Sequence, residues 1–365
     1  MTSTAVAPST RSDTAGQPAR FRATSDYSQL LKEVRAAGLL AKRRGFYLWL
    51  LAGLTAALTA CGVASVLIGH SWFQLLIAGF VGILLTQIAF VGHEAAHRQV
   101  FKSHKTNEWV GLVLANLVVG LSFAWWNNKH NKHHANPNTI GHDPDIEDPV
   151  VAFTPQQFAT RKGPLRWIAQ RQGYLFFPLL LLEGLNLHRD ALQTVFGRSD
   201  IKRRPMEIIT LMVRLVAVPA VLFIFLPPGI AFAAWGVQLA VFGFYMGASF
   251  APNHKGMPLL EERGMLDFLQ RQVLTSRNVR GGWFNTSLMG GLNYQVEHHL
   301  FPSMPRPHLA EAQRIVQRFC NERGIPYTEV SLVTSYKAVV QYLNRVGLGA
   351  RDPFECPLQQ MRKTG

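Results

Sequence analysis

The chain has 365 residues, a formal net charge of +15 and a hydrophobic fraction of 48%. No nucleic-acid-binding motif accompanies this charge, so we assign the basic residues to an anionic membrane surface and expect no nucleic-acid partner. The three cysteines, Cys61, Cys320 and Cys356, show no C-x-x-C spacing, which argues against a disulfide framework or a thiolate metal site and suits a reducing cytoplasm.

The two ends of the chain are expected to lie outside a single central domain. Residues 1–25 are rich in Ser, Thr, Ala and Pro and lack the apolar core of a signal peptide, so we predict a disordered tail. An amphipathic helix is predicted over Asp26–Arg44, lying on the membrane surface. Residues 348–365 resemble a second tail, which leaves residues 26–347 as the domain.

Four apolar segments are long enough to cross a bilayer as helices. They comprise residues 46–68, 73–91, 208–226 and 229–250. Only a few residues join the members of each successive pair, so we predict two helical hairpins. The joining residues carry no Lys or Arg, whereas the opposite flanks are basic, so the positive-inside rule places both termini in the cytoplasm. Arg214 is the one charge within these segments and is expected to reach the interface from near a helix end.

Two other apolar stretches are not expected to cross the membrane. Residues 109–126 separate two histidine-rich segments, so they should begin and end on the same face if those segments share one site. Residues 174–185 are short and are interrupted by Pro178 and Glu183, which indicates an interfacial helix.

The part of the chain after residue 250 is polar, and helices are predicted there at 307–323 and 330–346. The predicted fold is therefore an all-α integral membrane protein. It has four transmembrane helices in two hairpins, additional interfacial helices, and a cytoplasmic helical cap that holds a histidine-rich site for two metals.

Seven of the 13 histidines fall in three short clusters. The clusters read H-E-A-A-H over 93–97, H-N-K-H-H over 130–134 and Q-V-E-H-H over 295–299. On a helix, residues four apart point to the same side. The first cluster thus presents His93 and His97, the second presents three imidazoles, and the third repeats the second with Gln295 in place of the leading histidine.

The number of imidazoles indicates more than one metal ion. The candidates are His93, His97, His130, His133, His134, His298 and His299, with His254 after the fourth apolar segment as an eighth. Seven or eight ligands exceed the three or four that one zinc ion takes, and neutral imidazole suits Fe, Zn, Cu or Ni. A pair of metals therefore fits better, and Asn253 and His254 are expected to close the site.

Carboxylates follow the second cluster. Asp143 and Asp145 are expected to orient ligating histidines by accepting their second ring N–H, and the alternative is a solvated acidic loop.

Two other functions share some of these features. H-E-A-A-H is similar to the H-E-x-x-H of zinc proteases, with Glu94 as general base, but the other clusters would then have no role. A metal transporter would place its polar groups inside the spans, whereas these histidines lie at the ends of spans.

The three clusters in this order resemble the membrane fatty acid desaturases. Two stretches are similar to the front-end branch of that family. The third histidine box of the branch matches G-G-L-N-Y-Q-V-E-H-H-L-F-P-S-M-P-R over Gly290–Arg306, and its second box matches H-N-K-H-H-A-N-P-N followed by D-P-D. The resemblance covers about residues 45–346. It implies two iron ions held by the eight histidines, with Gln295 as a weak ligand or the holder of a water molecule.

The resemblance also implies the reaction, the O₂-dependent insertion of a cis double bond into a long acyl chain bound to coenzyme A or to a lipid. Trp125 and Trp126 become candidates for the wall of an acyl tunnel, with an interfacial aromatic belt as the alternative. Hydroxylation of a lipid, carotenoid or alkane is the alternative reaction on the same scaffold.

Many front-end desaturases carry a fused cytochrome b5 domain with an H-P-G-G haem motif. Residues 1–45 contain no histidine, so electrons are expected from a separate protein: a ferredoxin, a flavoprotein reductase or a free cytochrome b5-like protein. The expected surroundings are membrane lipids, in a plasma membrane of bacterial type.

Overall fold

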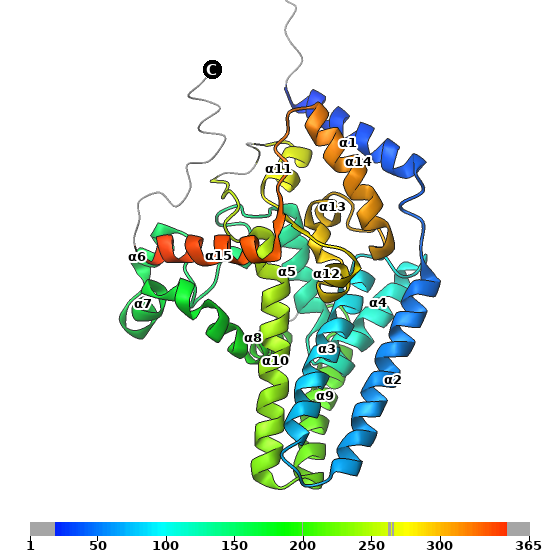
Figure 1. Cartoon of the computed structure of the whole chain (residues 1–365), viewed down its shortest axis with the longest axis vertical. Coiled ribbons are helices and arrows are strands. Elements are labelled where there is room, and N and C mark those ends of the chain that lie inside the picture. Colours follow the sequence, from blue (N-terminus) through cyan, green and yellow to red (C-terminus); the bar gives the residue numbers. More distant parts are fainter. Residues whose placement is uncertain (1–18, 199, 262–263, 265, 349–365) are drawn as a thin grey trace, which may run out of the picture.

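The structure is a computed structural model that describes residues 19–198, 200–261, 264 and 266–348. Within these residues, four helices are long and apolar enough to cross a membrane. They are α2 (Arg44–Ile68), α3 (Gln74–Ala96), α9 (Arg204–Phe225) and α10 (Pro228–His254). Short links join α2 to α3 and α9 to α10, so the predicted hairpins are confirmed. In Figure 1 the four helices form the lower bundle, and both links lie at its lower end.

The link between α2 and α3 satisfies its own backbone. A helix C-terminus leaves carbonyl groups without partners, which is costly away from water. The buried Gln74 amide donates to the carbonyls of Ser65 and Gly69, both at 2.8 Å. Gly69 has φ +61°, a conformation that permits the tight reversal. The sequence of this link thus closes the first hairpin.

Glycines bring the helices around α10 into backbone contact. A Cβ atom added at Gly82 of α3 would lie 2.8 Å from the carbonyl oxygen of Gln238. A Cβ atom at Gly243 would lie 2.1 Å from the backbone nitrogen of Gly184, on helix α8 (Gln172–Gly197). Both distances are too short for any side chain, so these contacts fix how α3 and α8 pack against α10.

Helix α8 is much longer than the interfacial helix predicted over 174–185. It runs for 26 residues and keeps Pro178 inside its first half. Its packing against α10 and against α15 (Leu332–Gly347) outweighs the single backbone hydrogen bond that a proline removes.

The stretch predicted over 109–126 is bent. It consists of α4 (His104–Leu112), a π-helix η1 (Val113–Val119) and α5 (Phe123–Ala135), with a bend of 114° at the break. The buried carboxylate of Glu207, in the first turn of α9, accepts hydrogen bonds from Asn116 Nδ2 and Ser122 Oγ, each at 2.8 Å, and from the Ala124 amide at 3.2 Å. Glu207 therefore stabilises the break that directs α5 toward the histidine site.

Arg214 was predicted to reach the interface from near a helix end, and this was wrong. It lies midway along α9, and its Nε donates to the carbonyl oxygen of Val118 at 2.7 Å. The π-helix η1 leaves carbonyls near its end without helical partners, and the guanidinium satisfies one of them.

We call α1, α11 to α15 and the two strands the cap, which lies above the bundle in Figure 1. Its remaining elements are α1 (Ala19–Ala36), α11 (Phe268–Leu274), β1 (Asn278–Arg280), α12 (Trp283–Leu288), α13 (Gln295–Leu300), α14 (Leu309–Glu322) and β2 (Glu329–Ser331). The other short elements are η2 (Pro144–Ile146), α6 (Pro155–Thr160), α7 (Gly163–Gln170), η3 (Leu292–Tyr294) and η4 (Arg306–His308). Strands β1 and β2 pair in parallel and form a small sheet. Strands of three residues are too short to be recognised from a periodic pattern in the sequence.

Helix α1 was predicted to lie on the membrane, but it packs inside the cap. Leu30 and Val34 are fully buried in one apolar cluster with Val316 and Phe319 of α14. The apolar stripe of α1 is therefore covered by protein instead of lipid. The tails were predicted over 1–25 and 348–365. Residues 1–18 and 349–365 lie outside the described residues, but 19–25 belong to α1, which begins at Ala19 instead of Asp26.

The contact at Gly243 yields a test of the packing. We expect Gly243→Ala to lower the stability of the folded protein by about 1–3 kcal/mol, because the methyl group forces α8 away from α10. Thermal unfolding in detergent, followed by fluorescence-detected gel filtration, measures this. Gly236→Ala on the same helix is the control, since its Cβ meets open space. Equal unfolding temperatures for both variants would contradict the packing.

Candidate metal centre

The three histidine clusters and His254 meet at one place, where the bundle joins the cap. His93 lies in the last turn of α3 and His97 caps that helix. The second cluster lies on α5, the third on α13, and His254 is the last residue of α10. All four elements end at this level, which is why residues far apart in the sequence become neighbours.

The histidines form two separate groups. In each group the potential ligand atoms lie within 4.8 Å of one another. The larger group comprises His93, His97, His130, His134 and His298, and the smaller comprises His133, His254 and His299. We call them the five-histidine and the three-histidine cluster. Sequence reasoning predicted the members but not this division, because the second and third boxes each supply both clusters.

The ring nitrogens in the clusters face each other at short distances. In the five-histidine cluster, His130 Nε2 lies 3.0 Å from His93 Nε2 and 2.9 Å from His97 Nε2. In the three-histidine cluster, His254 Nε2 lies 3.3 Å from His133 Nε2 and 3.1 Å from His299 Nε2.

The hydrogen bonds of the outer ring nitrogens, Nδ1, show which atoms the three-histidine cluster directs inward. The Nδ1 atoms of His133, His254 and His299 each face an acceptor: the Asp143 carboxylate at 3.0 Å, the Thr275 carbonyl at 2.9 Å and Gln272 Oε1 at 2.8 Å. Each Nδ1 therefore carries the proton, and each Nε2 points a lone pair into the cluster. Three buried lone pairs that converge repel one another unless a cation lies between them, so the residues present fit a metal ion.

Both acidic residues named in the sequence analysis lie beside His133: Asp143 contacts it and Asp145 is close by. The Asp143 carboxylate is fully buried and also accepts hydrogen bonds from the amides of Asn138 at 2.7 Å and Asp145 at 2.9 Å. Asp145 Oδ2 lies 3.5 Å from His133 Nδ1, and its other oxygen pairs with Lys129 at 3.2 Å. The sequence analysis did not identify Gln272 and Thr275. A single glutamine or a backbone carbonyl has no sequence pattern that would indicate a hydrogen bond to a distant histidine.

Burial keeps most of these imidazoles neutral, which is the form that binds metals. It lowers the pKa of His97 to about 3. It also lowers the pKa values of His130, His134, His298 and His299 well below the usual range. His133 differs, because burial lowers its pKa but the carboxylates of Asp143 and Asp145 outweigh that effect and raise it.

Gln295 belongs to the three-histidine cluster. Its Nε2 lies 2.9 Å from His254 Nε2, and its Oε1 accepts a hydrogen bond from Asn253 Nδ2 at 3.1 Å. Gln295 therefore lies beside the cluster that has only three imidazoles. The sequence did not predict to which cluster it belongs.

Glu94 does not face the clusters. Its two carboxylate oxygens accept hydrogen bonds from Arg306 Nε at 2.9 Å and Arg306 Nη2 at 2.6 Å, and Tyr47 Oη donates to it at 3.1 Å. Because both oxygens are engaged in this buried pair, Glu94 is not placed as the general base of a zinc protease. The pair instead connects α2 and α3 to the loop that follows the third histidine box.

Glu297, the glutamate of the third box, is also turned away from the clusters. It accepts hydrogen bonds from Asn278 Nδ2 and Tyr327 Oη, both at 2.7 Å, and burial raises its pKa to about 7. These bonds hold α13 against strand β1 and the segment before β2.

The two tryptophans before the second box have different surroundings. Trp126 stacks on His130, with ring centroids 4.3 Å apart. Trp125 is buried and lines a polar cavity of about 650 Å³ between α5, α8 and the η2 region. Neither tryptophan is among the exposed large apolar residues, and Trp126 is partly buried.

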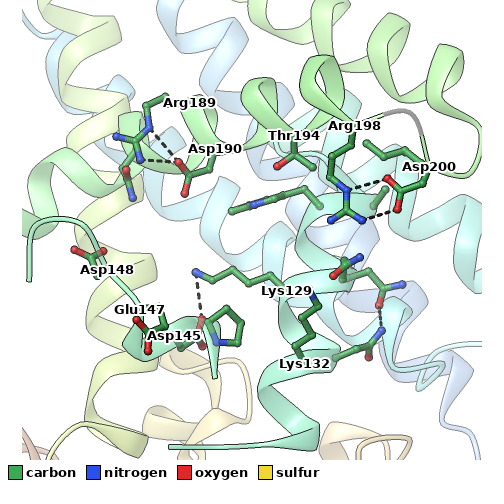
Figure 2. A pocket seen from close by; sticks show the side chains of 18 of the residues that line it. Lys129, Lys132, Asp145, Glu147, Asp148, Arg189, Asp190, Thr194, Arg198 and Asp200 are labelled. Carbon is green, nitrogen blue, oxygen red and sulfur yellow. Dashed lines mark hydrogen bonds and ion pairs between the residues drawn. The ribbon is translucent and has the colours of Figure 1, made fainter. Parts of the chain in front are cut away.

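The cavity carries nearly balanced charge and is linked to the metal site. Its charged lining residues are Lys129, Lys132, Arg189, Arg198 and Lys202, with Asp145, Glu147, Asp148, Glu183, Asp190 and Asp200. Figure 2 shows Lys129 reaching Asp145, with the pairs Arg189–Asp190 and Arg198–Asp200 above it. Asp145 thus touches both the cavity and His133.

The remaining histidines lie outside both clusters. His70, His104 and His142 are exposed and His308 is partly exposed. His188 differs, because it is buried on α8 and its Nδ1 contacts the carbonyl oxygen of Gly184 at 2.5 Å.

The buried Glu94–Arg306 pair yields a test of how the site is held. Glu94→Gln should destabilise the protein by about 3–5 kcal/mol, because the guanidinium loses its buried counter-charge. Adding Arg306→Met should restore part of that loss, as measured by thermal unfolding. Glu33→Gln, which removes the exposed partner of Arg318, is the control and should leave unfolding unchanged. Equal effects of the two glutamate changes would refute the proposed role of the pair.

Known proteins match this chain over most of its length. A family model described as fatty acid desaturase matches residues 70–331. A Delta(8)-fatty-acid desaturase of Helianthus annuus is 27% identical over 354 residues, which are 90% of this chain and 74% of that protein. An acyl-lipid (9-3)-desaturase of Physcomitrium patens is 30% identical over 296 residues, 75% of this chain and 54% of that protein.

A Delta 8-(E)-sphingolipid desaturase of Kluyveromyces lactis is 27% identical over 356 residues, 91% of this chain and 61% of that protein. The matched region contains all three histidine boxes, His254 and the residues that orient them. The resemblance in the sequence is thereby confirmed: the chain belongs to the fatty acid desaturase family and is a membrane-embedded acyl desaturase.

Proposed function

We propose that the two clusters bind two iron ions and that the protein uses them with dioxygen to insert a cis double bond into a long acyl chain. The observation that carries this proposal is the convergence of buried imidazole nitrogens in two adjacent groups. The reaction consumes O₂, two electrons and two protons, converts CH₂–CH₂ to CH=CH and yields two water molecules. When bound, the iron pair supplies the oxidising power that an inert methylene C–H bond requires.

The donor set and the reaction together favour iron. Imidazole nitrogen suits iron, zinc, copper and nickel alike, so the ligands alone select none of them. Zinc has no redox change, whereas desaturation is an oxidation that consumes electrons. Among the redox-active metals, we choose iron because the chain resembles the desaturases.

Each residue near the clusters then has a definite role. The proposed ligands are His93, His97, His130, His133, His134, His254, His298 and His299, with Gln295 as a weak ligand or the holder of a water molecule. Asp143 and Asp145 keep the proton of His133 on Nδ1, so that Nε2 faces the metal. Trp126 covers His130 and excludes water from that side.

The polar cavity is the proposed site for the polar end of the acyl carrier. It lies against Trp125, and the neighbouring Trp126 contacts the five-histidine cluster, so a chain that passes both rings reaches the metals. Five basic and six acidic side chains line it. This balance favours a zwitterionic lipid head group over a polyanionic carrier such as coenzyme A. The Physcomitrium relative is named as an acyl-lipid desaturase, which supports the same choice.

We also propose the orientation in the membrane. The links between the paired spans carry no Lys or Arg, whereas the flanks at the cap carry many. We infer from this asymmetry that the cap and both termini lie in the cytoplasm, and we propose a plasma membrane of bacterial type. A separate cytoplasmic donor, namely a ferredoxin, a flavoprotein reductase or a free cytochrome b5-like protein, delivers the electrons there.

Histidine substitutions test the metal assignment. We expect His298→Ala, in the five-histidine cluster, and His133→Ala, in the three-histidine cluster, each to abolish desaturation, because both metals are needed. The measurement is gas chromatography–mass spectrometry of lipids from a host without polyunsaturated fatty acids, with immunoblots of the membrane fraction. His142→Ala, an exposed histidine nearby, is the control. Desaturation retained in either cluster variant would contradict the assignment of the two clusters as metal sites.

A charge reversal tests the cavity. Lys132 lines it and is exposed, and its ammonium makes no hydrogen bond or ion pair with any described residue, so this group is available for a phosphate. Lys132→Glu should raise the KM for an acyl phosphatidylcholine about tenfold and change kcat much less, as the loss of one charge-assisted contact predicts. Lys105→Glu, on α4 and outside the cavity, is the matched control. An unchanged KM, or turnover with acyl-coenzyme A alone, contradicts this part of the proposal.

A further inference from the structure

A proline lies in the last turn of α10, two residues before His254. Pro252 has no backbone N–H, so the carbonyl of Ala248, one turn earlier, lacks its helical hydrogen bond. The Tyr336 hydroxyl of α15 donates to that carbonyl instead, at 2.8 Å. The end of the helix that carries His254 therefore depends on the cap as well as on its own backbone.

The last carbonyls of α10 also find donors in the cap. A helix C-terminus leaves such groups without helical partners. The guanidinium of Arg277 donates to the Pro252 carbonyl from Nε at 2.8 Å and from Nη2 at 2.5 Å, and Nη2 also donates to the Lys255 carbonyl at 2.9 Å. The backbone amide of Arg277 donates to the Asn253 carbonyl at 2.8 Å. One residue of the cap thus binds carbonyls on both sides of His254.

Arg277 is a buried cation that has no carboxylate partner among the described residues. Its side chain is 3% exposed, and burial lowers its pKa to about 10, so the guanidinium stays charged at neutral pH. A buried charge is costly unless the polar groups around it compensate. Here the compensating groups are carbonyl oxygens at the C-terminus of α10, where the helix dipole is negative. The guanidinium and the end of α10 therefore hold each other in place.

The segment that contains Arg277 also fixes the ring of His254. The carbonyl of Thr275, two residues before Arg277, accepts a hydrogen bond from His254 Nδ1 at 2.9 Å. Thr275 and Ser276 are fully buried, so the cap encloses this segment. Thr275 thus sets the rotation of the imidazole, and Arg277 fixes the backbone that carries it. Both are needed to aim Nε2 of His254 into the three-histidine cluster.

We propose that Arg277 is a positioning residue for one of the two metals: it binds the carbonyls on both sides of His254 and so keeps Nε2 of this histidine in the three-histidine cluster. The inference rests on the proposed metal binding and deepens it. Without the guanidinium, the last turn of α10 loses three hydrogen bonds next to the one that Pro252 already lacks. The five-histidine cluster has no member on α10, so its metal should not depend on Arg277.

The test measures how tightly the purified full-length protein holds Fe(II), by competition with a coloured chelator under anaerobic conditions. The native protein should bind two irons. Arg277→Met keeps the length of the side chain and removes its donors, so it should weaken the binding of one iron about 10–100-fold and leave the other unchanged. Arg277→Lys keeps the cation and one donor, so it should weaken that iron less than Arg277→Met does.

Double variants identify which iron depends on Arg277. His254→Ala removes an imidazole from the three-histidine cluster, so adding Arg277→Met to it should weaken iron binding no further, because both residues act on the same metal. His97→Ala removes an imidazole from the five-histidine cluster, so adding Arg277→Met to it should weaken the second iron as well.

Gly347→Ala controls for a loss of stability alone. Its Cβ atom would lie 2.3 Å from the carbonyl oxygen of Ala169, in the contact between α15 and the end of α7. This variant should lower the unfolding temperature in detergent and leave both irons bound as in the native protein.

The outcomes separate the two levels of the proposal. Two irons in the native protein, with Arg277→Met binding both as tightly as the native protein or weakening both equally, would overturn the role of Arg277 alone. A further loss when Arg277→Met is added to His254→Ala would do the same. Fewer than two irons in the native protein would overturn the proposed metal centre, and this inference with it.

Discussion

Eight imidazoles are held with their ring nitrogens facing one another inside the protein, and the rest of the structure serves that constraint. In the three-histidine cluster the outward nitrogens all meet fixed acceptors, so the inward ones present lone pairs that repel each other in the absence of a cation. Such an arrangement persists only if each supporting helix is anchored independently. For α3, α5 and α10 the anchors are buried polar groups and backbone contacts, and none of them is itself a candidate ligand.

Each supporting element has a different anchor. The Glu94–Arg306 pair connects the end of α3 to the loop after the third box. Glu207 accepts three hydrogen bonds at the break before α5, and so sets the direction of the helix that carries the second box. Contacts at Gly82 and Gly243 leave no space for a side chain and thereby fix α10, which ends in His254. Charged groups that the apolar spans tolerate poorly are thus concentrated where they position the histidines.

The sequence predicted those features of the structure that follow from local, periodic patterns. The four spans follow from uninterrupted apolar length, and the box histidines follow from helical spacing, because both patterns are local. What it missed is not local. The division into five and three histidines depends on how the side chains of α5 and α13 meet in space. Glu207 and Arg214 gave no periodic signal, and the amphipathic pattern of α1 was the same whether its apolar face met lipid or α14. Pro178 suggested a break that packing against α10 and α15 overrides.

The central claim is that the two histidine clusters hold two metals at once. An anomalous difference map at the iron absorption edge, from crystals of the iron-loaded protein, tests this most directly. The account predicts two peaks, one among the five histidines of the larger cluster and one among His133, His254 and His299. A single peak, or a peak at the other candidate group formed by His133, Asp143 and Asp145, would contradict it.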